Sequence, residues 1–196
     1  MLLVALLLVP CASALAQPEP TTVDDFSGDI AQWLSKPNVS LSAENGCLRA
    51  DVDFSQASYG WLRKTYPGSP LDVSARDGVR FRARGGGPGC KVSVHLMTDA
   101  AAEKPPTLAT VTAPSLDAPD WQTFTFAWSA FAVQGSGRPV PPEALRHIEV
   151  VNISVTGTAG ASVTVWVDDV QFVALTPEEL MAQAQTPGGR ARIPDD

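Results

Sequence analysis

Apolar and polar residues alternate with a period of two in many segments between residues 23 and 173. A period of two places successive side chains on opposite faces, so it indicates β-strands with one buried face. Clusters of Gly, Pro, Asp, Asn and Ser separate these segments and are typical of turns. We therefore expect strands at residues 23–26, 47–54, 59–63, 79–84, 91–97, 108–112, 121–127, 148–156 and 162–173.

The number and spacing of these strands indicate the fold class. Many short strands with few helical windows are typical of an antiparallel β-sandwich or jelly roll. We therefore predict an all-β jelly-roll domain at residues 23–175, after a linker at residues 17–22. A single domain suits the length, because about 180 residues remain once the leader described below is removed.

Two helical segments interrupt the strand pattern. Residues 141–145 (PPEAL) can form one turn. Thr176, Pro177 and Glu179 form a capping box with proline at the first helical position, so we predict a short helix there. Residues 186–196, at the end of this C-terminal segment, are expected to be disordered.

The start of the chain has the pattern of a secretory signal. An apolar run from Leu2 to Val9 is followed by small residues at Ala14 and Ala16 and then by polar, proline-rich sequence. We predict cleavage after Ala16 and a secreted or periplasmic protein, since the run is too short to span a bilayer. A lipoprotein anchored through Cys11 is the alternative, although Pro10 stands where a small residue is expected.

The charge of the chain narrows its partners. The formal net charge is −7, and no basic cluster is present in the sequence. Such a chain is poorly suited to nucleic acid or to anionic membrane surfaces. We therefore predict no nucleic-acid partner and no membrane span, and we expect a monomer.

Two cysteines follow the predicted signal. Cys47 and Cys90 each stand immediately before an apolar alternation, CLRADVDF and CKVSVHLM, so they could lie at the same end of two strands. In an oxidising compartment this arrangement predicts a disulfide. Two buried free thiols are the alternative.

Catalytic motifs find no support in the sequence. There is no G-x-S-x-G elbow, and residues 85–87 (GGG) lead into a strand, which indicates a hairpin turn instead of a phosphate-binding loop. The two histidines, His95 and His147, are far apart in sequence, unlike a clustered metal site. A glycosidase requires two facing carboxylates, and no local carboxylate-rich strand motif is present. The sequence therefore favours binding over catalysis.

A series of sequence blocks resembles a known group of binding domains. In order, the blocks are VDDFSGDIAQW, GWLRKTY, LDVSARDGVRFRARG, CKVSVHLMTD, WQTFTFAWSAF, LRHIEVVNISVTG and VTVWVDDVQFV. Together they resemble galactose-binding-like jelly rolls, in particular family 11 carbohydrate-binding modules and the related domain of complex I intermediate-associated protein. The resemblance spans about residues 23–173 and implies two antiparallel sheets with a concave sugar-binding face.

The resemblance also implies a structural calcium ion that ties the first strand to the last. It places Asp25 and Asp168 on the calcium-site pattern, with Asp24 and Asp169 as neighbours that could substitute. In VTVWVDDVQF the apolar period slips at Asp168–Asp169, as a β-bulge would cause, and a bulge frees backbone carbonyls and aims carboxylates off the sheet. The alternative is that these aspartates end strands at solvent or accept hydrogen bonds from loop amides.

Candidate ligand residues should lie on the faces opposite the core alternation. Aromatic rings there stack on the apolar patches of sugars, while Arg, His and Asn bond the hydroxyls. The residues that meet these conditions are Tyr59, Trp61, Arg82, His95, Asn152 and Trp166. Trp61 and Trp166 could equally pack under a loop or against the helix. We assign Trp121 to the core, and Arg80 and Arg84 to a solvated face.

The sequence thus predicts an exported module that binds a polysaccharide or oligosaccharide without transforming it. The alternative is an exported protein–protein interaction or envelope protein on the same fold, and a jelly-roll lyase or hydrolase ranks third. A face with two or more exposed aromatic side chains and Arg or His between them favours the glycan. A flat polar face favours a protein partner, and a carboxylate pair in a cleft favours an enzyme.

Overall fold

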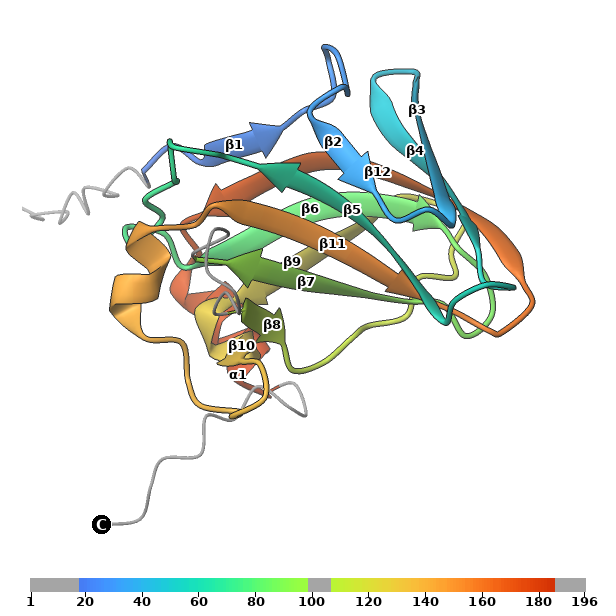
Figure 1. The fold of residues 1–196 in the computed structure, drawn as a ribbon. Helices are drawn as coiled ribbons and strands as arrows, with labels where there is room; N and C mark the ends of the chain where they lie inside the picture. The colour runs from blue at the N-terminus through green and yellow to red at the C-terminus, as the bar shows by residue number, and fades with distance from the viewer. Residues whose placement is uncertain (1–17, 99–106, 186–196) are drawn as a thin grey trace, which may run out of the picture.

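The computed structural model describes residues 18–98 and 107–185, and shows two antiparallel sheets packed as a sandwich with one short helix after the last strand (Figure 1). The predicted fold class is therefore confirmed. The predicted signal at residues 1–16, the alternative anchor Cys11 and the tail at residues 186–196 lie outside the described residues.

Each sheet is assembled from strands that are distant in sequence. The strands of sheet A follow the order β3 (Val39–Glu44), β4 (Cys47–Asp53), β12 (Ser162–Val173), β6 (Gly78–Gly85) and β9 (Gln122–Ala127), and β1 (Thr21–Asp24) also pairs with β12. The strands of sheet B follow the order β10 (Phe131–Val133), β8 (Thr107–Thr110), β7 (Lys91–Met97), β11 (Val150–Thr156), β5 (Tyr59–Thr65) and β2 (Trp33–Ser35). Every predicted strand corresponds to one of these, whereas β2, β3 and β10 were not predicted.

The core lies between the two sheets and is built from the inward members of each alternation. On β7, for example, Val92, Val94 and Leu96 are at most 1% exposed, while the residues between them face outward and are only partly buried. Burial of one such side chain stabilises the fold by about 1.5–3 kcal/mol. The alternation thus fixes which side chains remain available on each outer face.

The last strand, β12, contains the predicted irregularity. Asp168 pairs with Arg82 on β6, and the next pair joins Gln171 to Arg80. Because three steps along β12 face two along β6, β12 carries one extra residue, as in a β-bulge. Asp169 has a φ of 50°, in the left-handed region. The slip read from the sequence at Asp168–Asp169 is therefore confirmed.

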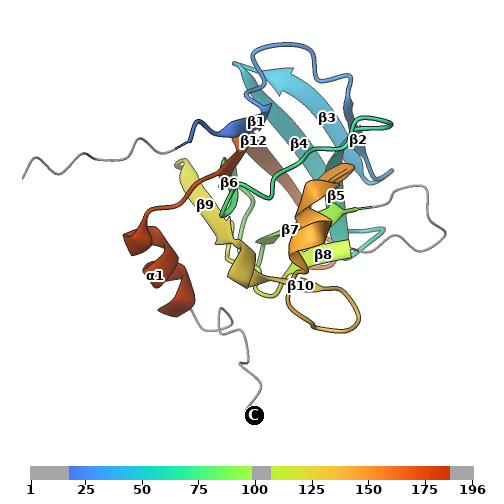
Figure 2. The same cartoon turned by 90° about the vertical axis from the view of Figure 1, so that its left-hand side faces the viewer.

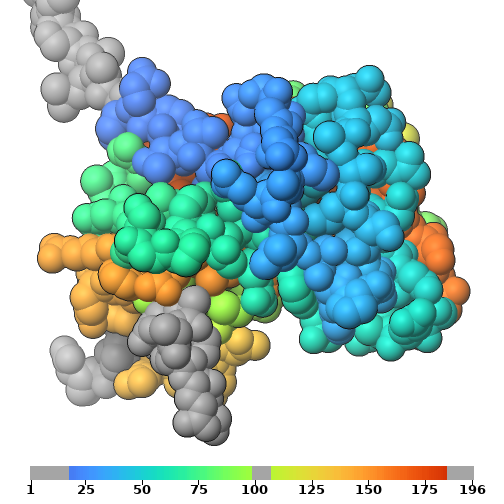
Figure 3. Space-filling model, turned by 45° about the horizontal axis from the view of Figure 1, so that its top comes forward, coloured from blue at the N-terminus to red at the C-terminus, as the bar shows by residue number. Residues whose placement is uncertain are grey.

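The bulge lies where the neighbour of β12 changes. On this edge, residues 162–167 of β12 pair with β4, and residues 170–172 pair with β1. Figure 3 shows the N-terminal segment, in blue, running from β1 across the upper edge of the sandwich toward β2 and β3. The first and last strands of the domain are thus joined directly, at the place where the resemblance implies a metal ion.

Helical structure is confined to short segments. The 3-10 turns are η1 (Trp128–Ala130) and η2 (Pro142–Arg146), and α1 (Pro177–Gln185) lies beside β9 (Figure 2). The predicted capping box is present, because the Thr176 N–H donates to Glu179 Oε2 at 2.9 Å and the Glu179 N–H donates to Thr176 Oγ1 at 3.2 Å. No helix in the described ranges has the length and apolar character needed to cross a membrane.

The predicted disulfide is wrong, because Cys47 and Cys90 are free, buried thiols. Cys47 begins β4, whereas Cys90 precedes β7 at the other end of the sandwich. β7 begins opposite Thr156, beside the connection between β11 and β12. Residues of that connection form backbone hydrogen bonds with Phe54, which follows the end of β4, so Cys90 lies near the end of β4 and Cys47 at its start. Cys47 is the first residue of β4 and Cys90 directly precedes β7, but the two strands run in opposite directions. Burial raises the pKa of both thiols.

Candidate functional site

The predicted ligand residues lie on two different faces of the sandwich. Four of them, Tyr59, Trp61, His95 and Asn152, face outward from sheet B, on β5, β7 and β11. Arg82 and Trp166 face outward from sheet A, on β6 and β12. The period of two gives the face of each residue within its strand, but it does not show which sheet a strand joins.

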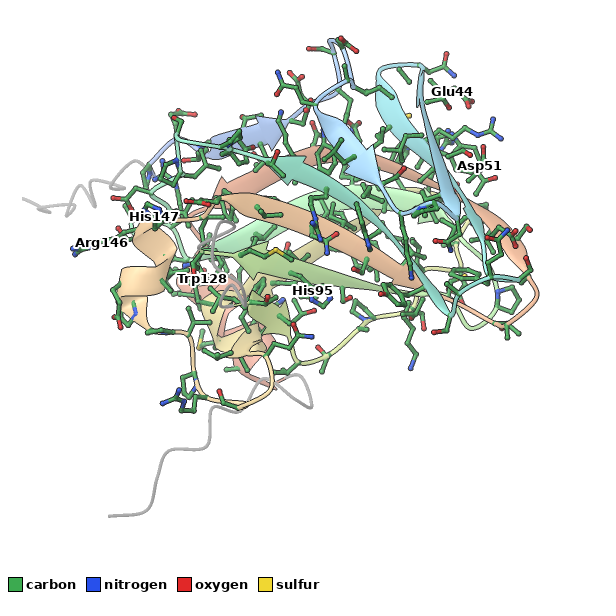
Figure 4. The ribbon with its side chains drawn as sticks, viewed as in Figure 1. Glu44, Asp51, His95, Trp128, Arg146 and His147 are labelled. Atoms are coloured by element: carbon green, nitrogen blue, oxygen red, sulfur yellow. The ribbon has the colours of Figure 1, made fainter. Side chains whose placement is uncertain are left out.

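The sheet B face has a row of small polar side chains on its central strand with longer side chains on both sides. We define this face as Tyr59, Trp61, Arg63, Ser93, His95, Asn152 and Ser154. On β11, Asn152 stands opposite Arg63 of β5 and His95 of β7. Figure 4 shows His95 over the middle of sheet B, well separated from Glu44 and Asp51 of sheet A. Asn152 and Ser154 are 5% and 6% exposed, because the longer neighbours cover them.

Two buried polar atoms of this face have no partner among the described residues. They are Oδ1 of Asn152, an acceptor, and Nε of Arg63, a donor. These two residues are opposite each other in neighbouring strands. Leaving a buried polar group unpaired costs about 1–3 kcal/mol, so such a pair is suited to a bound water or to a ligand that donates and accepts.

Cations cover the two aromatic rings of the face. Lys36 Nζ lies 3.4 Å from the centroid of the Tyr59 ring, and Arg63 Cζ lies 4.4 Å from that of Trp61. Tyr59 nevertheless remains 43% exposed. The cations therefore hold both rings in place, and Tyr59 remains partly exposed at the surface.

His95 is poised to act as a neutral hydrogen-bonding group. Burial lowers its pKa, and the positive charge of Arg63 lowers it further. Its Nε2 lies 3.2 Å from Ser93 Oγ. Because the imidazole stays neutral at pH 7, it can donate from one ring nitrogen and accept at the other.

Arg63 and Ser154 belong to this face but were not predicted. Both share a face with predicted residues, since Arg63 is two positions from Trp61 and Ser154 two from Asn152. That spacing was the available signal.

The aspartates predicted to bind calcium are engaged in other contacts. Asp25 is exposed and accepts hydrogen bonds from the backbone N–H and hydroxyl of Ser27. Asp168 forms an ion pair with Arg82 at 2.5 Å, and Asp169 forms one with the same guanidinium at 2.8 Å. The hydrogen bond from the Ser27 backbone N–H to Asp25 matches the alternative in which these aspartates accept hydrogen bonds from loop amides, whereas the ion pairs with Arg82 were not predicted.

Asp24 is the more buried member of the first aspartate pair, and it binds a lysine. Lys64 Nζ lies 2.7 Å from Asp24 Oδ2 and donates to the Val23 carbonyl at 2.8 Å, while Trp33 Nε1 donates to Asp24 Oδ2 at 2.9 Å. Within the described ranges, no group of three or more His, Cys, Asp or Glu side chains could hold a metal ion. In this structure Asp24, Asp168 and Asp169 form ion pairs, and Asp25 accepts hydrogen bonds from Ser27. Calcium binding itself stays an untested prediction.

Comparison with known proteins locates this fold among carbohydrate-binding modules. No family model and no curated protein matches the chain. Among solved structures, the family 11 carbohydrate-binding module of the cellulosomal cellulase Lic26A-Cel5E of Clostridium thermocellum is 13% identical, with a TM-score of 0.60 over 82% of this chain and 97% of that one. The family 11 module in complex with a β-1,3-1,4-mixed-linked tetrasaccharide is 13% identical, with a TM-score of 0.57 over 79% of this chain and 95% of that one.

Modules of larger enzymes have the same fold. An exo-β-agarase is 16% identical, with a TM-score of 0.62 over 80% of this chain. The chain spans about a quarter of that enzyme's length, and likewise of the agarase AgWH50C. The predicted likeness to family 11 modules is thus confirmed at the level of the jelly-roll fold. The likeness to the complex I intermediate-associated domain stays a prediction.

Proposed function

We propose that this protein binds a polysaccharide through the sheet B face, without cleaving it. The observation that carries the proposal is a pair of buried atoms, Asn152 Oδ1 and Arg63 Nε, which have no partner among the described residues and lie on the same face as the ring of Trp61. A sugar hydroxyl both donates and accepts, so one hydroxyl or two neighbouring ones can satisfy both atoms.

The other residues of the face complement this pair. Tyr59 and Trp61 offer ring surface for the apolar patches of a sugar, and neutral His95 offers a further polar contact. A mixture of aromatic surface and a few placed polar groups is typical of ligand sites.

The composition of the face supports binding without hydrolysis. The strands β5, β7 and β11 contain no Asp or Glu. Glycoside hydrolysis generally requires two carboxyl groups that flank the scissile bond. Export through the predicted signal segment would bring such a binding face into contact with extracellular or envelope polysaccharide.

Affinity gel electrophoresis tests the proposal. The protein is run through native gels that contain mixed-linkage β-glucan, agarose or other soluble polysaccharides, and at least one of them should retard it. Trp61→Ala and Arg63→Ala should weaken the retardation at least tenfold, equivalent to about 1.4 kcal/mol. Arg80→Ala is the matched control, because Arg80 is an outward-facing arginine on the opposite sheet.

Thermal melts establish that each variant is folded. The proposal fails if no polysaccharide retards the wild-type protein, or if Arg63→Ala and Trp61→Ala bind as well as Arg80→Ala does. Absence of retardation by every polysaccharide would favour the protein-partner alternative instead.

A further inference from the structure

The outer face of sheet A presents arginines that are, with one exception, paired with carboxylates. Arg80 contacts Glu179, and Arg82 contacts Asp168 and Asp169. Arg84, two positions further along β6, forms no ion pair with any described residue. Of the three β6 arginines Arg80, Arg82 and Arg84, Arg84 is thus the one whose positive charge has no carboxylate partner among the described residues.

Arg84 lies between two tryptophans. Its Cζ is 5.0 Å from the ring centroid of Trp121 and 5.0 Å from that of Trp166. The prediction that Trp121 belongs to the core is wrong, because the residue, directly before β9, is only half-buried and its ring lies beside Arg84. Stacking on both sides restricts the rotation of the guanidinium, so its donors are held in position.

A hollow of about 570 Å³ adjoins this stack. Its walls include Arg84, Gly85, Asp117, Thr164 and Trp166. Gly85 has a φ of 89°, and a Cβ there would lie 3.0 Å from two carbons of the Trp166 ring. The absence of a side chain at Gly85 therefore allows the indole to rest on the backbone.

Two of the residues that line the hollow carry unused hydrogen-bonding groups. Nε of Arg84 and Nε1 of Trp166 are buried donors without a partner in the described part of the chain. Asp117, an exposed acceptor, stands on the rim. Buried donors, an acceptor and the edges of aromatic rings are the groups that a polyhydroxylated ring requires.

We propose that this hollow is a second saccharide-binding site, so that one molecule holds two neutral polysaccharide chains on opposite faces. The ligand class rests on the function proposed above, whereas the placement rests on Arg84, Trp166 and the hollow alone. Because the ring faces are occupied by guanidinium and backbone, the second site recognises its ligand mainly through hydrogen bonds.

Indole N–H signals in nuclear magnetic resonance spectra test this proposal residue by residue. The chain contains five tryptophans. The full-length protein is titrated with the β-1,3-1,4-mixed-linked tetrasaccharide and, separately, with an agaro-oligosaccharide. Trp33 and Trp128 are internal controls, because their indole N–H groups already donate to Asp24 and to the Arg76 carbonyl.

We expect two independent sets of shifts with different dissociation constants. One set belongs to Trp61, and the other to Trp166 and Trp121. Arg84→Lys and Trp166→Phe should weaken the second titration at least fivefold and leave that of Trp61 unchanged. Arg80→Lys, on the same face but paired with Glu179, should change neither. Unshifted signals of Trp33 and Trp128 show that the variants keep the fold.

The possible outcomes separate the two proposals. If only Trp61 responds at saturating probe, the second site is refuted and the first stands. If only Trp166 and Trp121 respond, the sheet B site is refuted and the second stands. No response of Trp61, Trp121 or Trp166 to either probe contradicts both. With both sites active, wild-type protein should also cross-link the soluble polysaccharide and raise its turbidity, and Trp166→Phe should not.

Discussion

The ion pair between Asp24 and Lys64 should contribute much of the stability at the N-terminal edge of the domain. The two side chains are 15% and 12% exposed, and the Asp24 carboxylate also accepts from the indole of Trp33. Asp24→Ala leaves the lysine ammonium nearly buried without a counter-charge. Breaking such a pair costs about 3–5 kcal/mol. At about 2–4 °C per kcal/mol for a domain of this size, the melting temperature should fall by roughly 6–20 °C.

Asp25→Ala is the matched control, because Asp25 is the adjacent, exposed aspartate and bonds only Ser27 in the described structure. Its effect should stay within about 0.5 kcal/mol. The wild-type protein and both variants are unfolded in urea, once with added calcium and once with chelator. For each protein the urea midpoint should be the same in calcium and in chelator. If Asp25→Ala costs as much as Asp24→Ala, or if chelation lowers the midpoint, the ion-pair reasoning is refuted and the calcium prediction is supported.

The pH dependence of Asp24 gives a second check. Burial alone would raise the pKa of Asp24, but hydrogen bonds from Lys64, Trp33 and the Phe26 backbone outweigh it, and the pKa falls below the ordinary value of 3.8. A lowered folded pKa stabilises the protein above pH 3.8, and this contribution is lost as the pH falls through the folded value. The difference in unfolding free energy between wild type and Asp24→Asn should therefore shrink in strong acid. A difference that does not change with pH would contradict this assignment.

Three further outcomes can be measured on the same material. Gly60→Ala should destabilise by about 1–3 kcal/mol, because its Cβ would lie 2.5 Å from a valine methyl of β3, whereas Gly28→Ala, with no atom within 4 Å, should not; urea midpoints compare them. A reducing agent should leave the melting temperature unchanged, and mass spectrometry should find Cys47 and Cys90 alkylated only after unfolding. If the two cysteines resist alkylation in denaturant, they are joined in a disulfide and the structure is contradicted. Because the pKa of His95 is lowered, stability should decline as the pH drops below about 6.5, and His95→Asn should reduce that decline; equal slopes would contradict it.

The sequence predicts where individual strands lie better than it predicts which strands pair with one another. A period of two identified β6, β7, β11 and β12, and the phase slip at Asp168–Asp169 located the bulge, because both signals are local. Strands β2 and β10 have three residues each, too few to show a period. β3 was missed although Val39 and Leu41 alternate with serine, since the helix-compatible residues that follow weaken the pattern.

Arrangement across strands depends on contacts that no local pattern encodes. The disulfide prediction failed because the direction in which β4 and β7 run is a property of the whole topology. Trp121 was assigned to the core, yet it is only half-buried and its ring lies beside Arg84. For the same reason the predicted site residues, though on outward faces, were divided between two sheets.

The cations above Tyr59 and Trp61 have a consequence for selectivity by chain length. In the free protein, Lys36 and Arg63 already occupy the ring surfaces that a sugar would use, so any ligand must first displace an internal competitor. Each such contact is worth about 0.5–1 kcal/mol, and losing both would weaken the binding of a single sugar unit by about 5–30-fold. A polymer spreads this loss over several units that bind together, whereas a monosaccharide cannot. The face should therefore bind free monosaccharides weakly and bind intact polysaccharide chains more tightly.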